Sequence, residues 1–284
     1  MKLLKRLILF TLASETDFFN QSEGFEYKVY HYLYDRLTNY QQSSIRDAIL
    51  QLVDSGEVDK ITRNAIPLFR LTSRGRDRLL SFFTISIGQK RVWDRIWRIA
   101  LLHSEKKSGG GKRKADKRKQ KVEDRKASRQ LRRGLEKLGF KQLSRGIYVT
   151  PLPISAKLRE FLLANDFLHK LTVIESRKLL VGDDEQLANH IWQLNSLIES
   201  YTKFISRANQ LLMLFKQQKS LLTKEKKAFS ALLTFYFSLL EKDPGLPKKL
   251  LPADWPADLA KERFLKLGER VSELENQAKI VDIV

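Results

Sequence analysis

The side chains that most often carry chemistry are few and scattered in this sequence. The four histidines are His31, His103, His169 and His190, and no two of them stand four residues apart, as helical metal ligands would. There is no cysteine, which removes disulfides, thiol nucleophiles and thiolate metal sites and is consistent with a reducing cytoplasm. Gly-x-Ser-x-Gly, Gly-x-x-x-x-Gly-Lys and Gly-x-Gly-x-x-Gly motifs are also absent. The sequence therefore predicts no enzyme, no metal site and no resident cofactor.

A metal-dependent nuclease is the one enzyme class that a basic chain leaves open. Such an enzyme needs clustered acidic residues at the end of a strand. The apolar segment 92–103 reads as a buried strand, but it ends in His103 and Ser104. We keep a nuclease as a third, weaker hypothesis, which metal-dependent cleavage of nucleic acid by the purified protein would revive.

Charge is the strongest positive signal. The formal net charge is +20, and it is unevenly distributed. Residues 1–85 hold 12 basic and 10 acidic side chains, residues 86–166 hold 23 and 8, and residues 167–284 hold 18 and 15. A net charge of +15 in the middle of the chain attracts polyanions by electrostatic steering and counterion release. This distribution indicates a nucleic-acid partner, although a solvated basic surface is the alternative.

The densest basic segment is a low-complexity stretch at 104–123, in which Ser108-Gly-Gly-Gly111 is followed by KRKADKRKQK. Glycines favour a flexible loop, and the basic residues favour a frayed helix or a disordered arm. No aromatic residues are interleaved, so the segment has no platform for stacking bases. It predicts non-specific phosphate contacts, or else an insertion without function. The candidate contact residues are Lys112, Arg113, Lys114, Lys117 and Arg118.

The N-terminus resembles a signal peptide only superficially. The apolar run Leu7–Ala13 is short, and Glu15 and Asp17 follow it without a small-residue cleavage site. Its apolar residues recur at helical spacing, which favours a buried helix over 2–13. No stretch approaches the roughly 20 apolar residues of a membrane span. We expect no membrane partner and a cytoplasmic location.

The first 85 residues have the element order of a winged helix-turn-helix. Helices are predicted at 2–13 and 25–36, the latter with Tyr27, Tyr30 and Tyr34 near one face. A third helix is predicted at 43–56, capped by Ser43 or Ser44 and ended by Gly56. Short strands at 58–61 and 68–71 follow, and then a helix capped by Thr72 or Ser73.

The third helix is the candidate recognition helix, since the second helix of such a pair lies in the major groove. Arg46 could pair with guanine and Gln51 with adenine, while Gln42 and Ser43 sit where phosphate contacts are common. The two strands would form the wing, and its turn at Arg63 and Asn64 could reach the DNA backbone or a minor groove, with Arg70 as a further candidate. Lys2, Lys5 and Arg6 could add phosphate contacts. The alternative is a winged helix that contacts protein. The predicted DNA-binding residues of this domain are Gln42, Ser43, Ser44, Arg46, Asp47, Gln51, Arg63 and Asn64.

The remaining chain predicts two further domains. The first has the ferredoxin-like order βαββαβ. Its elements are a strand at 92–103, a helix at about 124–138, two strands around Arg145-Gly146, a helix at 154–165 and a strand at 170–175. From 183 onward the pattern is all-helical, with helices at 184–219, 224–240 and 259–278. The fold class is thus α+β. Its predicted domains are a winged helix-turn-helix at 1–85, a ferredoxin-like domain at 86–182 with the basic insertion 104–123, and a helical domain at 183–284.

Three segments resemble the PaaX family, the repressors of phenylacetic-acid catabolism operons. Trp93-Asp94-Arg95-Ile96-Trp97-Arg98 is similar to the family's Trp-Asp-x-x-Trp-Arg strand, and Leu131–Pro151 is similar to its helix, Leu-Gly-Phe and Gly-aromatic-Val-x-Pro segment. The most specific match is the segment Asp243–Pro256 (DPGLPKKLLPADWP) followed by Phe264. The insertion at 105–122 is longer and more basic than the family pattern, and residues 14–26 replace a shorter loop. The alternative for the proline-rich loop is a purely structural role, with Trp255 packing it onto the helices.

The resemblance implies a winged helix, a middle domain similar to the small CRISPR-associated nuclease fold, and a helical C-terminal domain. It also implies a homodimeric repressor released from operator DNA by an acyl-CoA effector. This sequence contains no recognisable ligand-binding motif, so the acyl-CoA effector rests on the resemblance alone. The first hypothesis is therefore a dimeric repressor on double-stranded DNA. The second is a non-specific nucleic-acid-binding protein that uses the basic arm, with the winged helix serving assembly.

Overall fold

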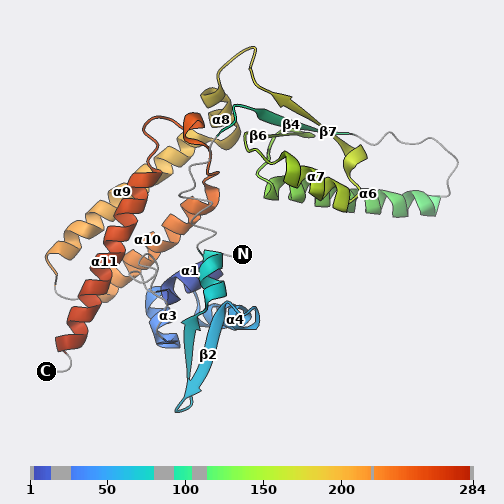
Figure 1. The fold of residues 1–284 in the computed structure, drawn as a ribbon. Coiled ribbons are helices and arrows are strands. Elements are labelled where there is room, and N and C mark those ends of the chain that lie inside the picture. The colour runs from blue at the N-terminus through green and yellow to red at the C-terminus, as the bar shows by residue number, and fades with distance from the viewer. Residues whose placement is uncertain (1–2, 14–26, 80–92, 104–113, 219–220, 282–284) are drawn as a thin grey trace. The chain divides into compact units, whose positions relative to one another are not determined.

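The computed structural model describes residues 3–13, 27–79, 93–103, 114–218 and 221–281 (Figure 1). They form a mixed helix-and-sheet protein, so the α+β class is confirmed. The chain divides into two compact units. Unit 1 contains residues 1–89, 195–245 and 254–284, and unit 2 contains residues 90–194 and 246–253. The three domains expected from the sequence stay a prediction, but the N-terminal segment and the C-terminal helices belong to the same unit.

Unit 1 begins with three helices and a small sheet. The helices are α1 (Leu3–Leu12), α3 (Tyr30–Arg36) and α4 (Gln42–Asp54). The sheet has the order β1-β3-β2, built from β1 (Lys28–Val29), β2 (Val58–Arg63) and β3 (Ile66–Leu71), and both pairings are antiparallel. The predicted helix 25–36 is wrong in its first turn, because residues 28 and 29 pair with β3 as a strand.

A short helix at 73–79 follows β3, and Thr72 caps it. The Thr72 hydroxyl oxygen accepts a hydrogen bond from the Gly75 backbone N–H at 3.1 Å, which is one of the two caps expected from the sequence. Gly75 is buried, and a Cβ added to it would lie 2.1 Å from the Glu57 carbonyl oxygen. This helix therefore approaches the start of β2 at a distance that only glycine allows.

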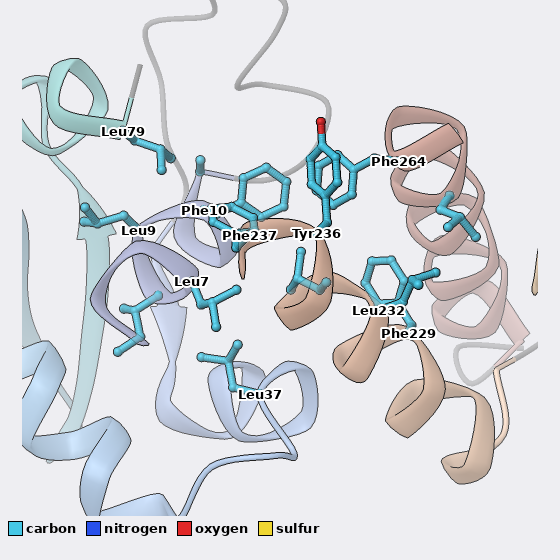
Figure 2. Close-up of a cluster of buried hydrophobic side chains, with 14 of the residues drawn as sticks. Leu7, Leu9, Phe10, Leu37, Leu79, Phe229, Leu232, Tyr236, Phe237 and Phe264 are labelled. Atoms are coloured by element: carbon cyan, nitrogen blue, oxygen red, sulfur yellow. The ribbon is translucent and has the colours of Figure 1, made fainter. Parts of the chain in front are cut away.

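Three long helices complete unit 1: α9 (Leu194–Lys216), α10 (Thr223–Lys242) and α11 (Ala257–Val281). Figure 2 shows how side chains from both ends of the chain meet in one core. Phe10 of α1 lies 5.2 Å from Phe237 and 5.4 Å from Phe264 between ring centroids, and Tyr236 stacks on Phe264 at 4.2 Å. The N-terminal helices thus share their core with the C-terminal ones.

The long helical segment predicted over 184–219 contains two helices. It is divided into α8 (Asp184–Trp192) and α9, because Gln193 adopts a left-handed conformation with φ of 54°. Asp183 caps α8 by accepting a hydrogen bond from the Gln186 backbone N–H at 2.8 Å. The break separates α8, which belongs to unit 2, from α9, which belongs to unit 1.

Unit 2 is built on a four-stranded antiparallel sheet of order β5-β6-β4-β7. Its strands are β4 (Trp97–Leu102), β5 (Lys141–Ser144), β6 (Ile147–Thr150) and β7 (Leu171–Ser176). The connecting helices α6 (Lys114–Lys137) and α7 (Ser155–Ala164) lie along the same face of the sheet (Figure 1). The short 3-10 helices are η1 (Leu168–Lys170) and η2 (Lys248–Leu250). The core between helices and sheet contains Leu131, Leu135, Tyr148, Leu158 and Leu162.

Two boundaries in unit 2 differ from those predicted. The strand predicted from Val92 begins at Trp97, because Asp94 to Ile96 form a turn in which Asp94 accepts a hydrogen bond from the Ile96 backbone N–H. Helix α6 begins at Lys114, ten residues before the predicted start at 124. Residues 114–123 are rich in good helix formers, which explains why the helix extends into the predicted insertion.

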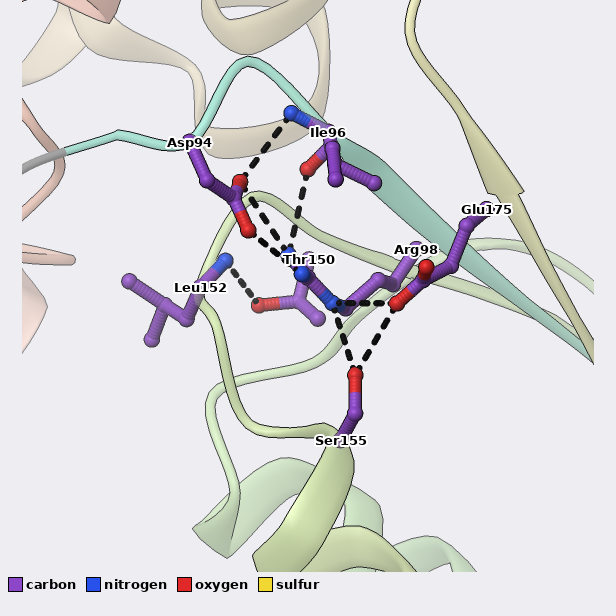
Figure 3. A network of polar contacts seen from close by, with 7 residues as sticks. All are labelled: Asp94, Ile96, Arg98, Thr150, Leu152, Ser155 and Glu175. Atoms are coloured by element: carbon purple, nitrogen blue, oxygen red, sulfur yellow. Dashed lines mark hydrogen bonds and ion pairs between the residues drawn. The ribbon is translucent and has the colours of Figure 1, made fainter.

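The Trp-Asp-x-x-Trp-Arg segment forms a polar network at the start of β4 (Figure 3). Arg98 is buried and donates hydrogen bonds to Asp94 at 2.5 Å, to Glu175 of β7 at 3.0 Å and to Ser155 at 3.1 Å. The Trp97 indole N–H donates to Asp184 of α8 at 2.7 Å. The segment that carries part of the family resemblance therefore joins β4 to β7, α7 and α8.

Candidate nucleic-acid interface

Helix α4 has one buried side and one polar side. The spacing i, i+4, i+7, i+8 predicts a buried stripe of Ile45, Ile49, Leu52 and Val53. The first three are buried in the core of unit 1 together with Ala48, and Val53 is partly buried against it. The polar residues predicted to contact DNA all lie on the exposed side. Leu50 lies there too and is 40% exposed, although the sequence analysis did not single it out. The exposed predicted residues are Gln42, Ser43, Ser44, Arg46, Asp47 and Gln51.

The start of α4 lies earlier than the sequence suggested. The helix begins at Gln42, its N-cap is Gln41, and no side chain caps it, so the predicted cap at Ser43 or Ser44 is wrong. Both serines lie in the first turn and are exposed. Backbone N–H groups in a first turn have no acceptor within the helix, and they favour an anion such as a phosphate.

Arg46 is held by aromatic side chains of α3. Its Nε donates a hydrogen bond of 2.6 Å to the Tyr34 hydroxyl, and its guanidinium carbon lies 5.7 Å from the Tyr30 ring centroid and 5.8 Å from that of Tyr34. The hydrogen bond to Tyr34 raises the pKa of Arg46. The sequence grouped Tyr30 with Tyr34 as one face of a helix, but it gave no signal that Arg46 would reach that face.

The β2–β3 hairpin has a two-residue turn. Arg63 pairs with Ile66, and the residues between them, Asn64 and Ala65, have φ of 49° and 63°. Positive φ at both positions is typical of the tight hairpin turns that follow the twist of the strands. Arg63 and Asn64 are exposed at this turn, and Ile66 beside them is 53% exposed. The hairpin projects beyond α3 and α4 (Figure 1).

Arg70 does not lie at the turn, so the suggestion that it extends a basic tip is wrong. It stands opposite Asp59 in the hairpin, and its Nη2 lies 3.0 Å from the Asp59 carboxylate. The Tyr27 hydroxyl donates to the same oxygen at 2.7 Å, and this bond lowers the pKa of Asp59. Arg6, another suggested phosphate contact, forms an ion pair of 2.5 Å with Glu241 of α10.

The predicted contacts of the basic insertion are described only in part. Lys112 and Arg113 lie outside the described residues. Lys114, Lys117 and Arg118 lie in α6, where the structure describes the backbone alone. The later turns of α6 expose more cationic side chains, which the sequence analysis had not singled out: Arg125, Lys126, Arg129, Arg132, Arg133 and Lys137.

Metal and membrane sites are not found in the described ranges. No group of three or more His, Asp or Glu side chains could hold a metal ion there. His103 instead makes hydrogen-bonding contacts to the His169 carbonyl at 3.0 Å and the Thr172 hydroxyl at 2.9 Å. Among the helices that the structure describes, none has the length and apolarity needed to cross a bilayer.

Two protein-family models match this chain. The model of the PaaX-like protein C-terminal domain matches residues 192–279, and the model of the PaaX protein central Cas2-like domain matches residues 122–188. The match to the central domain precedes the match to the C-terminal domain, and together they cover more than half of the 284 residues. The chain belongs to the PaaX family. The resemblance found in the sequence is thereby confirmed.

This chain is also similar to a curated protein and to a solved structure. The transcriptional repressor PaaX of Escherichia coli (strain K12) is 34% identical over 83 residues, a match that covers 28% of this chain and 26% of that repressor. The uncharacterized protein Rv0674 from Mycobacterium tuberculosis has a TM-score of 0.51 and 17% identity, with 84% of this chain and 86% of that chain covered. The second likeness concerns the fold alone. Membership in a family that includes a repressor is in line with the prediction that the chain is not an enzyme.

Proposed function

We propose that this protein is a DNA-binding transcriptional regulator, acting as a repressor, in the cytoplasm where its DNA target lies. Unit 1 would bind duplex DNA with α1, α3, α4, β2 and β3 as a winged helix-turn-helix. Helix α4 would lie in the major groove with the hairpin turn as the wing. Unit 2 would be a ferredoxin-like domain, which the strand order and the two helices on one face support.

The observation that carries this proposal is the division of α4 into two sides. Its apolar side chains fix it in the core, and six polar side chains are exposed along the other side. The exposed set combines a guanidinium and a primary amide, which suit guanine and adenine, with serines in the first turn, which suit a phosphate. The family membership and the repressor among its relatives support the same function.

Two further properties follow from the family resemblance and remain predictions. A homodimer would read a palindromic operator, because the two-fold symmetry of such a protein is matched by its DNA. An acyl-CoA effector would release the repressor by binding the form that does not bind DNA.

A titration of fluorescent DNA tests the function. The full-length protein is titrated against the duplex upstream of its own operon and against a scrambled duplex of equal length, each at about 50 and 200 mM salt. The Arg46→Ala/Gln51→Ala variant should bind the operon duplex at least about tenfold more weakly, because each good base contact is worth about 1–3 kcal/mol. Equal affinity of the wild type for both duplexes would contradict specific regulation.

The Lys203→Ala/Gln210→Ala variant is the matched control. It also removes one cation and one amide from exposed positions of a unit 1 helix, but from α9. Its affinity for the operon duplex should stay within twofold of the wild type. A loss equal to that of the α4 variant would show that general charge, and not α4, determines binding.

The second candidate function is non-specific binding of nucleic acid by α6. The exposed side chains of Arg125, Arg129 and Arg132 follow one another at i, i+4 and i+7, on one side of this helix. Replacing all three with alanine should reduce the slope of log K against log salt by up to about 3, since each phosphate contact contributes about 0.9. If that variant, or deletion of 106–121, abolishes all binding while Arg46→Ala/Gln51→Ala does not, the second function is the correct one.

A further inference from the structure

The tyrosines of the segment 27–34 each lie beside a cation. Arg70 lies 4.6 Å from the Tyr27 ring centroid, Arg36 lies 4.9 Å from that of Tyr32, and Arg46 lies beside Tyr30 and Tyr34. The first two cations come from β3 and from α3 itself. Arg46 is different, because it belongs to the exposed side of α4, where the proposed function locates the base contacts.

The two tyrosines that contact Arg46 are fixed in place by the core. Their rings stack with centroids 5.7 Å apart and an interplanar angle of 15°. Tyr30 also meets the fully buried ring of Phe69 edge-on at 4.6 Å. The Tyr34 ring is therefore held against Tyr30, which in turn packs against Phe69 of β3, and these contacts fix the position of the Tyr34 hydroxyl.

The hydrogen bond to Tyr34 engages one edge of the guanidinium. Arg46 has five N–H groups in a planar fork, and Nε carries only one of them. With Nε donating to Tyr34 at 2.6 Å, Nη1 and Nη2 retain the other four N–H groups, and one from each nitrogen points outward from the edge that the two nitrogens form. Two parallel N–H groups on such an edge match an acceptor with two adjacent lone-pair sites.

We propose that Tyr34 is a positioning residue that orients Arg46, so that the Nη1–Nη2 edge binds the O6 and N7 atoms of a guanine in duplex DNA. This inference rests on the proposed function. Arg46 loses less side-chain entropy on binding, because its plane is already held by Tyr34 and by the two ring faces. The same hydrogen bond fixes which edge of the guanidinium faces the DNA. Tyr34 therefore affects the preference for one DNA sequence over another, and it does not affect the charge of the protein.

The experiment begins with selection of duplexes from a random library by the full-length protein, and each variant is then titrated with the enriched duplex and with a scrambled one. The variants are Tyr34→Phe, Arg46→Ala, the double variant, and Tyr32→Phe as the matched control. The control removes the same hydroxyl from the same helix, beside a cation that does not come from α4. Circular dichroism verifies that all four fold.

Tyr34→Phe should weaken binding to the enriched duplex by about threefold to tenfold, which corresponds to one hydrogen bond. Its affinity for the scrambled duplex and its salt slope should match the wild type, because no charge is lost. In the Arg46→Ala background the same substitution should have no further effect, and Tyr32→Phe should bind the enriched duplex like the wild type. An enriched guanine that Arg46→Ala no longer prefers supports the base contact.

Four results would overturn the inference. Multiplicative losses in the double variant would mean that Tyr34 acts without Arg46. Equal losses on enriched and scrambled duplexes, with a smaller salt slope in Arg46→Ala, would assign Arg46 to a phosphate. A Tyr34→Phe variant that discriminates like the wild type removes the role of Tyr34 and leaves the proposed function intact, whereas a wild-type chain that enriches no duplex overturns both.

Discussion

At the scale of single residues, the polar network of Arg98 shows how one buried cation fixes several elements (Figure 3). The Arg98 side chain is 5% exposed, and its two carboxylate partners come from the turn before β4 and from β7. A buried guanidinium is tolerated only when its N–H groups have acceptors, and Asp94, Glu175, Ser155 and the Ile96 carbonyl supply them. This network stabilises unit 2 and gives the Trp-Asp-x-x-Trp-Arg segment a structural role.

The pH dependence of stability should reveal the Asp94 contribution. Hydrogen bonds from Arg98 lower the pKa of Asp94 in the folded protein. A carboxyl group with a depressed folded pKa stabilises the protein above its unfolded pKa of about 3.9, and this stabilisation is lost as pH falls through the folded value. Urea unfolding of wild type and Asp94→Asn should therefore differ most near pH 6, and the difference should shrink below about pH 4. A difference that stays constant down to pH 3 would contradict the assignment.

At the scale of elements, the helix at 73–79 depends on one close approach. Gly75→Ala should destabilise unit 1 by about 2 kcal/mol or more, because the added Cβ meets a backbone carbonyl at 2.1 Å and the Leu71 side chain at 2.8 Å. Helix propensity alone would predict the opposite, a gain of about 1 kcal/mol. Ser73→Ala, at an exposed position of the same helix, should change stability by less than about 0.5 kcal/mol. Thermal unfolding of the two variants decides between packing and propensity.

At the scale of the whole molecule, the proposed DNA-binding elements and the C-terminal helices share one hydrophobic core. Leu7 and Phe10 of α1 and Phe237 of α10 are almost completely buried in it (Figure 2). The N-terminal helices are therefore not a separable module. Their stability, and any effect of a signal on it, is coupled to the C-terminal region through direct contacts within unit 1.

A substitution in the C-terminal region should expose this coupling. Phe237→Ala should destabilise unit 1 by about 3–5 kcal/mol, the usual cost of removing a buried phenylalanine ring. Hydrogen exchange should show α4 and α10 losing protection together, although Phe237 lies far from α4 in sequence. Retained protection in α4 with loss in α10 alone would mean that the N-terminal elements fold independently.

Much of the fold could be predicted from local patterns. The buried stripe of α4, the hairpin around Asn64, the Thr72 cap and the end of a helix before Gly139, whose φ is 90°, all depend on residues close in sequence. The exposure of the predicted α4 residues follows from the same periodicity, because side chains opposite an apolar stripe face solvent. Family resemblance also rested on short ordered segments that can be read along the chain.

Local patterns sufficed to predict the fold class, most elements, the polar side of α4 and the family resemblance, because periodicity, turn residues and motifs are local properties. The tertiary structure was needed to show that Gln193 breaks a long helical pattern, that α1 packs against α10 and α11, and that Arg70 pairs with Asp59. It also decided that Tyr34 holds Arg46, twelve residues away on another helix. These outcomes depend on which surfaces meet when the chain compacts, and propensity and spacing do not encode that choice.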